Sequence, residues 1–261
     1  MSTCEFIIAL FCKVHDAMSE VPAHPRAHLH PSELVTLGLL WALKGGSQRA
    51  FYRWLKSNWL FLFPRLPERT RLMRLMAAHQ DWADRFLSEP TVLGICDSYG
   101  IELIHPRREG RSPGQIGKKG LSNRRWIVGA KFCTLLNRFG LFVDWCWDSA
   151  NVHDSSFNDL IAEYAGRMVV LTDSTFHSKE GDPDNLKVCK RGTWGVRSLV
   201  ETVNSLLSGV FHLKHLGERV DAYLTARLSF VVGAYNLLVQ WQGMEADERG
   251  VTPLSIAQFM L

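Results

Sequence analysis

The sequence predicts an α/β protein in which a mixed β-sheet carries helices on its faces and follows a helical region. Through residues 1–90, apolar side chains recur at helical spacing. From Thr91 onward, short apolar runs typical of buried strands alternate with amphipathic stretches. The 261 residues, 46% of them apolar, are enough for one large domain with a smaller one attached. We therefore expect a helical region over residues 1–90 and a sheet domain over residues 91–261.

The helical region is predicted to contain at least four helices. Their expected ranges are Cys4–Met18, Ser32–Leu43, Gln48–Leu60 and Glu68–Leu75. His30 or Ser32 is expected near the cap of the second helix, and Gly45 with Gly46 ends it. Two helices joined by a short glycine-containing turn fit a DNA-binding helix-turn-helix, and they fit a plain helical cap equally well.

The second region alternates strands and helices in an order typical of a mixed sheet. The expected elements are a strand over Val92–Cys96, a hairpin of Trp126–Leu136 with Gly140–Trp147, a helix from Asp154 to about Tyr164, strands at Met168–Leu171 and Leu186–Cys189, a helix around Glu201, and a long helix from about Glu218 to Gln242. The order strand, hairpin, helix, strand, strand, helix favours a sheet covered on its faces by helices.

A strongly basic segment runs from His105 to Lys131. Its glycines predict a flexible loop through its middle, and it contains one acid, Glu109. The basic residues are Arg107, Arg108, Arg111, Lys118, Lys119, Arg124, Arg125 and Lys131. A charge run is commonly just a solvated surface, but this excess of positive charge directly follows a candidate metal ligand and favours phosphate binding. The net charge of +4 permits a nucleic-acid partner without establishing one.

Cysteine spacing and hydropathy indicate a cytoplasmic protein. The six cysteines are scattered without a CxxC motif, so we expect reduced thiols and neither a disulfide framework nor a zinc site. The apolar stretch Phe6–Phe11 is short and lacks the features of a signal peptide. No apolar run approaches the roughly 18–20 residues that span a bilayer, so no membrane association is expected.

Three acidic residues are candidate metal ligands. Asp97 and Asp173 each follow a short apolar run, and Glu201 lies on an amphipathic helix. Ligands gather beyond the carboxyl ends of strands in open sheets, and carboxylates are the preferred ligands of Mg²⁺. Two such ions can stabilise the attacking and leaving oxygens of phosphoryl transfer.

Other acids and other interpretations compete with this one. Asp at a strand end is commonly a turn residue. Asp144 and Asp148 alternate with apolar residues in a predicted hairpin strand, and Asp154 is best explained as a helix cap. Each acid alone is therefore a weak signal.

The helix around Glu201 separates polar from apolar residues clearly. The side of Glu201 also carries Trp194, Arg197, Asn204, Ser205 and Ser208. The opposite side carries Val196, Leu199, Val203, Leu206, Leu207 and Val210. Arg197 precedes Glu201 by one helical turn and can pair with it, either as an ordinary surface salt bridge or as part of an active-site face.

These residues resemble a signature of the DDE transposases of bacterial insertion sequences, of the kind found in families 4, 5 and 982. That signature reads Tyr, two residues, Arg, three residues, Glu, six residues, Lys. Here the same positions hold Trp194, Arg197, Glu201 and Ser208. The stretches CDSYGIEL and His153-Asp154 are also similar to the family, and the three acids are 76 and 28 residues apart, as suits this class.

The resemblance implies an RNase H-like catalytic domain with a DDE motif of Asp97, Asp173 and Glu201. These acids would hold two Mg²⁺ ions, for which Mn²⁺ can substitute, and act as an endonuclease and strand transferase in DNA transposition and recombination. The implied partners are double-stranded DNA (the element's terminal inverted repeats and the target) and a second copy in a homodimer, associated with the nucleoid. The implied DNA-binding residues are Arg197, Trp194, Asn204, Arg107, Arg108, Arg111, Lys118, Lys119, Arg124, Arg125 and Lys214.

The sequence departs from the signature at Ser208, where a phosphate-binding Lys is expected. Lys214 or His212 is a candidate substitute, and weakened or re-routed binding of DNA ends is the expected result. Three alternatives stay open: a nuclease that hydrolyses without joining, a non-catalytic DNA-binding relative of a transposase, and an ordinary α/β protein whose acids are turn residues and caps.

Overall fold

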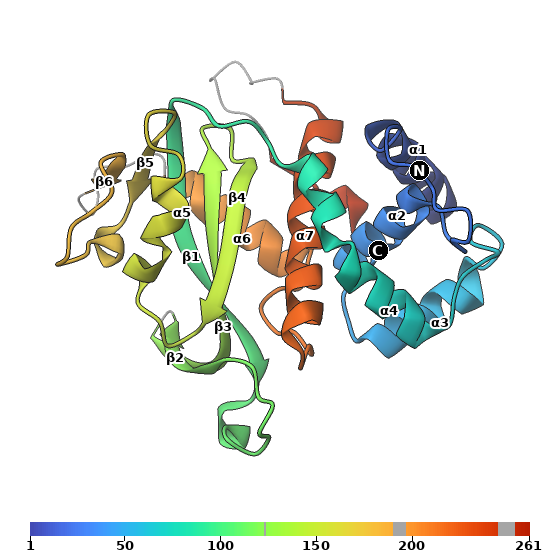
Figure 1. Ribbon diagram of the computed structural model, residues 1–261, viewed down its shortest axis with the longest axis horizontal. Helices are drawn as coiled ribbons and strands as arrows, with labels where there is room; N and C mark the ends of the chain where they lie inside the picture. Colours follow the sequence, from blue (N-terminus) through green and yellow to red (C-terminus); the bar gives the residue numbers. More distant parts are fainter. Residues whose placement is uncertain (123, 190–196, 245–253) are drawn as a thin grey trace.

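A mixed sheet forms the centre of one half of the molecule (Figure 1). The computed structural model describes residues 1–122, 124–189, 197–244 and 254–261, with Arg197 described for its backbone only. The described strands are β1 (Leu93–Ile104), β2 (Lys118–Ser122), β3 (Arg125–Asn137), β4 (Phe142–Ser149), β5 (Val169–Thr172) and β6 (Leu186–Val188). β1 pairs antiparallel with β3, and β3 with both β2 and β4. β5 runs parallel to β1, and β6 parallel to β5. The mixed sheet predicted from the sequence is confirmed.

The helices also agree with the prediction to within a few residues at their ends. They are α1 (Thr3–Ala17), α2 (Pro31–Lys44), α3 (Gln48–Asn58), α4 (Arg69–Ala78), α5 (Asn158–Ala162), α6 (Arg197–Gly209) and α7 (Asp221–Gln242), with 3-10 turns η1 (Gln80–Phe86), η2 (Pro106–Arg108), η3 (Asp154–Phe157), η4 (Ser174–Phe176) and η5 (Ala257–Phe259). His30 is the N-cap of α2, because its ring accepts from the Ser32 backbone and its own N–H donates to Glu33.

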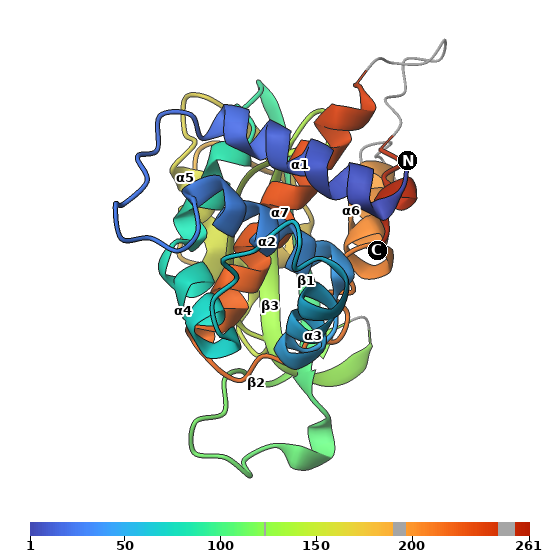
Figure 2. The ribbon, with the colours of Figure 1, turned by 90° about the vertical axis from the view of Figure 1, so that its right-hand side faces the viewer.

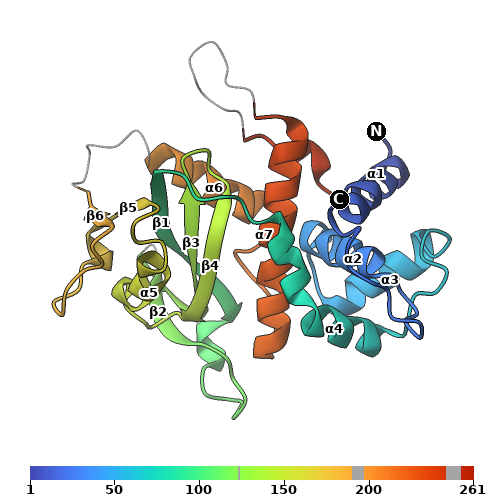
Figure 3. The same ribbon diagram turned by 45° about the horizontal axis from the view of Figure 1, so that its top comes forward.

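Helix α7 stands between the sheet and the N-terminal helices (Figures 1 and 3). Its buried Asn236 accepts from the backbone N–H of Phe142 on β4 and donates to the carbonyls of Phe142 and Phe86. Its buried Arg227 donates to the carbonyls of Trp41 and Ala42 at the end of α2. In Figure 2, α1 and α2 lie across α7 on the side away from the sheet. One apolar cluster therefore continues from the sheet into the N-terminal helices.

The length of α7 corrects one expectation. By length and composition the helix Asp221–Gln242 could cross a membrane, whereas the sequence was expected to hold no such stretch. In the structure, 83% of the qualifying stretch is buried against the rest of the chain. Buried core helices reach this hydropathy because both of their sides face apolar neighbours.

The two faces of the sheet carry different helices (Figure 3). α5 covers the face that includes the buried Cys96 and Leu135, together with Phe157 and Ile161. α6 and α7 cover the other face. Because side chains alternate along a strand, neighbouring residues of β1 serve opposite faces. All six cysteines are free thiols, as expected, and the Sγ atoms of Cys96 and Cys133 lie 3.3 Å apart.

Two sequence predictions about strand limits are wrong. Asp97 lies inside β1 and not after its end, because pairing with β3 continues to Ile104. The basic segment is a loop only as far as Gly117, apart from η2, and then forms β2, which was not predicted, whereas the start of β3 at Arg125 agrees with the predicted strand. Gly120 allows this, since a side chain there would collide with the backbone of Ala150. The loop before β2 projects from the lower end of the molecule in Figure 2.

Candidate active site

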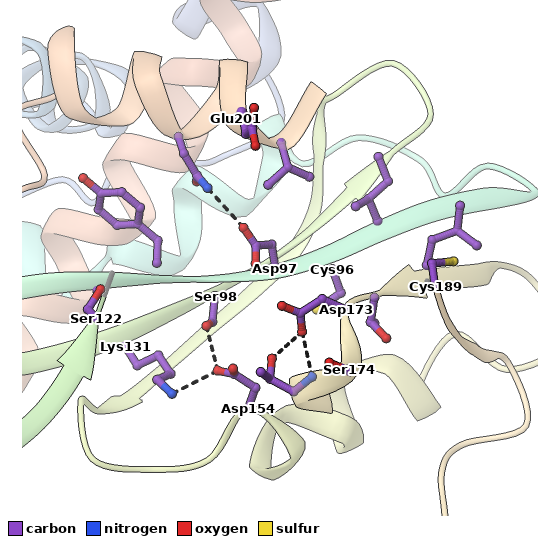
Figure 4. Close-up of a pocket in the computed structure, with 18 of the residues that line it drawn as sticks. Cys96, Asp97, Ser98, Ser122, Lys131, Asp154, Asp173, Ser174, Cys189 and Glu201 are labelled. Atoms are coloured by element: carbon purple, nitrogen blue, oxygen red, sulfur yellow. Dashed lines mark hydrogen bonds and ion pairs between the residues drawn. The ribbon is translucent and has the colours of Figure 1, made fainter. Parts of the chain in front are cut away.

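A cavity of about 920 Å³ opens where β1, β5 and α6 meet (Figure 4). Four acids line it: Asp97 from β1, Asp154 from η3, Asp173 from the end of β5 and Glu201 from α6. The structure thus brings all three predicted acids, 104 residues apart at their extremes, to one cavity. The structure also adds a fourth acid to the cavity, Asp154, which the sequence predicted to be a helix cap.

The parallel register of β1 and β5 explains why Asp97 and Asp173 meet. Ile95 pairs with Leu171, which is the last pair of that ladder. Asp97 and Asp173 each lie two residues further along their own strands, so the register places them side by side. β5 ends at Thr172 while β1 continues, which opens the edge of β1 at Asp97. The strand-end interpretation was therefore correct for Asp173 and wrong for Asp97.

Asp97 is electrostatically the most perturbed acid of the cavity. Burial, together with the negative charge of Asp173, raises the pKa of Asp97 to about 6. A hydrogen bond from the Asn204 amide to the Asp97 carboxylate, 3.2 Å long, opposes that rise. Asn204 lies on α6, so this bond ties the helix to the strand across the cavity (Figure 4).

Asp173 is held by the short turn that follows β5. It is the N-cap of η4: the backbone N–H of Thr175 donates to its carboxylate at 2.9 Å, and the Thr175 hydroxyl also donates to it. These hydrogen bonds from the following turn fix the orientation of the Asp173 carboxylate. The turn role that the sequence allowed for this residue and its place in the cavity are thus compatible.

Helix α6 presents its polar side to the cavity, as its sequence pattern predicts. Val203, Leu207 and Val210 are buried on the other side, and the exposed Glu201 and half-buried Asn204 line the cavity. Glu201 lies above Asp97 in Figure 4, at the opposite wall from Asp154. Trp194 lies outside the described residues.

Asp154 was predicted to cap a helix, and this prediction is wrong. The N-cap of η3 is His153, whose ring accepts from the backbone N–H of Ser155. Asp154 instead accepts a hydrogen bond of 2.7 Å from Ser98 and pairs with Lys131 at 3.0 Å (Figure 4). The His153-Asp154 pair was a usable signal, but the capping rule assigned it to the wrong residue of the two.

The electrostatics of Asp154 differ from those of Asp97. Burial alone would raise its pKa, but the hydrogen bond from Ser98, the nearby Thr175 hydroxyl and the Lys131 ammonium hold the pKa of Asp154 below its usual value. Asp154 is therefore ionised at neutral pH and paired with Lys131, whereas the pKa of Asp97 is raised to about 6. Environments that push two neighbouring carboxyl groups apart in pKa are typical of functional sites.

Of the basic residues of the predicted segment, Lys131 lines the cavity and the others do not. Among the described residues of its wall, Lys131 is the one basic side chain. Arg107, Arg108 and Arg111 are exposed on the projecting loop, Lys118, Lys119, Arg124 and Arg125 on the β2–β3 hairpin, and Lys214 after α6. Arg125 pairs with Glu102 at 2.5 Å, so part of its charge is already compensated.

Ser208, where the transposase signature that the sequence resembles has Lys, has a defined partner. Its hydroxyl lies 2.7 Å from the hydroxyl of Tyr99 on β1 and donates to the carbonyl of Asn204 on its own helix. The serine therefore joins α6 to β1 one turn beyond the Asn204–Asp97 bond. The proposed substitutes for the missing Lys, Lys214 and His212, are exposed beyond the helix end.

The donor chemistry of the cavity fits a hard divalent cation. All four acids offer carboxylate oxygens, and the pKa of Asp97 is raised mainly by burial and also by repulsion from Asp173, which a bound cation would relieve. Across the described ranges, no three His, Cys, Asp or Glu side chains stand close enough to hold one ion jointly. The acids thus share a cavity without forming a closed coordination cage.

Comparison of the chain with models of protein families, with curated proteins and with solved structures gives no match.

Proposed function

We propose that this chain is a metal-dependent enzyme that cuts and joins DNA strands, a DDE transposase with an RNase H-like catalytic domain. The observation that carries the proposal is the meeting of Asp97, Asp173 and Glu201 at one cavity from β1, β5 and α6. Three carboxylates on three separate rigid elements are what two-metal phosphoryl transfer needs.

The order of elements supports the same proposal. Four strands whose neighbours pair antiparallel (β1 to β4), a helix, two strands parallel to β1, and then the Glu201 helix follow one another, and this order fits such a domain. The helical region before residue 91 supplies room for DNA binding outside the catalytic cavity, either as a helix-turn-helix or as a supporting cap.

Each residue of the cavity has a separate role in the proposed phosphoryl transfer. Bound Mg²⁺ or Mn²⁺, held by Asp97, Asp173 and Glu201, would activate the attacking oxygen and stabilise the leaving one. Asn204 positions Asp97, Thr175 positions Asp173, and Lys131 neutralises Asp154. In cleavage, water adds to phosphorus and a 3′-hydroxyl leaves. In joining, that hydroxyl attacks a phosphorus of the target and displaces the target's own 3′ oxygen.

Supercoiled plasmid DNA incubated with Mg²⁺ or Mn²⁺ tests the chemistry. Wild-type protein should nick or linearise it, and Asp97→Asn should lose that activity. Asp148→Asn is the matched control, because Asp148 is an exposed acid of β4 outside the cavity and accepts from its own Ser149 backbone. Activity that survives Asp97→Asn would exclude this site.

Joining is tested separately with labelled oligonucleotides that end in a 3′-hydroxyl or a 3′-deoxy group. A transposase should transfer only the hydroxyl-ended strand into plasmid DNA. Cleavage without transfer favours a hydrolysing nuclease. Binding of DNA without any metal-dependent cleavage favours the non-catalytic relative.

A further inference from the structure

We infer that the β2–β3 hairpin (Lys118–Ser122 paired with Arg125–Gly129) is a binding site for unpaired DNA, on which Trp126 stacks a base beside the acid cavity. The inference rests on the proposed function for the choice of DNA as ligand. The new element is that the bound DNA is locally single-stranded next to the position where it is cut.

The first observation is an exposed apolar pair at the end of the hairpin. Leu121 and Trp126 face each other across the two strands, and each leaves 56% of its surface in solvent. A tryptophan carries one of the largest apolar surfaces of any side chain, so leaving it in water forfeits stabilisation. The exposed ring contributes little to the stability of the fold, and such exposure is typical of a contact surface.

The second observation is the positive charge around that pair. The ammonium of Lys119 lies 5.3 Å from the centre of the Trp126 ring, within the range of a cation–π contact. Lys118 and Arg124 are also exposed on the hairpin. Aromatic faces flanked by cations bind single-stranded nucleic acid, because the ring stacks on a base and the cations attract phosphate.

The third observation is the position of the hairpin beside the cavity. Leu121, Ser122 and Ile127 are part of the cavity wall, and Ser122 marks its margin in Figure 4. The strand that carries Trp126 continues to Lys131, which pairs with Asp154. A DNA strand with a base stacked on Trp126 would therefore extend along the hairpin toward the acids of the cavity.

The hairpin is also held firmly in place. Gly120 lies against the backbone of Ala150, and the backbone N–H of Lys118 donates to the Ser149 hydroxyl at 2.6 Å. Arg125 forms an ion pair with Glu102 on the neighbouring strand β1. A preorganised platform of this kind loses little conformational entropy when a ligand binds.

Unpaired DNA is the occupant that these features favour. In a duplex, the faces of the bases are already stacked on their neighbours, so an aromatic ring can reach only a base that has left the helix. A protein partner or a second copy of the chain would use the apolar pair but has no need of the surrounding lysines and arginines.

Fluorescence anisotropy with a labelled oligothymidine of about 16 nucleotides, in EDTA, tests the inference apart from catalysis. The wild-type protein should bind it more tightly than a duplex of equal length. Trp126→Ala should weaken binding by about 5- to 150-fold, and Trp126→Phe should restore most of it. A 2-aminopurine base in the same strand should lose fluorescence on stacking with wild-type protein and not with Trp126→Ala.

Phe139→Ala is the matched control. Phe139 is an exposed aromatic of the β3–β4 turn with Arg138 at 4.4 Å from its ring, and it lies about 40 Å along β3 from Trp126. Equal affinities of wild type, Trp126→Ala and Phe139→Ala would overturn the inference. So would equal loss of affinity in Trp126→Ala, Trp126→Phe and Phe139→Ala, or concentration-dependent dimerisation through Trp126 without DNA binding. If 2-aminopurine stacks on Trp126 but the protein cuts no DNA, only the proposed function is refuted and this inference stands.

Discussion

Asn204 donates a hydrogen bond of 3.2 Å to the carboxylate of Asp97, and these two residues are 107 positions apart in the chain. The bond joins the middle of α6 to the middle of β1 at the floor of the cavity. It stabilises the ionised form of a carboxyl group whose burial favours the protonated form. The helix thus sets the charge state of an acid on the sheet.

Replacing Asn204 with Ala should therefore raise the pKa of Asp97 further and weaken Mg²⁺ binding near neutral pH. We expect cleavage to fall by about 10- to 100-fold at pH 7 and to recover partly at pH 8.5, as for loss of an outer-shell partner of a metal ligand. The control is Thr202→Ala, because Thr202 is exposed on the same helix and its hydroxyl donates to the Ser198 carbonyl. An unchanged pH profile for Asn204→Ala would contradict this role.

The raised pKa of Asp97 predicts the pH dependence of stability. A carboxyl group with a folded pKa near 6 and an unfolded value of 3.8 binds a proton more tightly in the folded state. The folded protein is therefore favoured below pH 4, and that advantage is lost as the pH rises through 6. Asp97→Asn should stabilise the metal-free protein at pH 8 by up to about 3 kcal/mol and change little at pH 4.

Thermal unfolding in EDTA at several pH values measures this effect. Adding Mg²⁺ at pH 8 should stabilise the wild type and leave Asp97→Asn unaffected, since the variant lacks the charge that the ion neutralises. Asp148→Asn should follow the wild type in both respects. The prediction is contradicted if the melting temperature of the wild type, relative to that of Asp97→Asn, rises between pH 4 and pH 8.

The Lys131–Asp154 pair predicts a coupled effect on stability. Both side chains keep only 13–14% of their surface in solvent, so removing one partner leaves a poorly solvated charge. Lys131→Met should cost about 1–3 kcal/mol of unfolding free energy and raise the pKa of Asp154. The double variant with Asp154→Asn should recover part of the loss, and additive losses in urea unfolding would show that the pair is not coupled.

Ser208→Lys should introduce the basic residue that the resembled transposase signature has at this position and add about one phosphate contact. The logarithm of the DNA affinity should then fall about one unit more steeply with the logarithm of salt concentration. The exchange also breaks the Tyr99–Ser208 hydrogen bond, which Tyr99→Phe removes without adding charge. If Ser208→Lys leaves both the affinity for DNA and its salt dependence unchanged, the serine does not explain weakened end binding.

The elements themselves could be predicted because they depend on local pattern. Amphipathic spacing located α6 and its polar side, and short apolar runs located β5 and β6. Asp154 shows the limit of that approach. A capping role and a site role for Asp154 fit its sequence neighbours equally well. The contacts with Ser98 and Lys131, 56 and 23 residues away, show that it belongs to the site and is not the cap.

The sequence by itself determined the α/β class, the order of strands and helices, and the three acids proposed as ligands, because hydrophobic period and residue chemistry are local properties. The tertiary structure alone decided that Asp97 lies within a long strand, that Asp154 and Lys131 belong to the same cavity, and that Trp126 stands exposed beside it. Each of these depends on which strand ends first in the sheet and which distant residue fills the space, and pairing register and packing decide both.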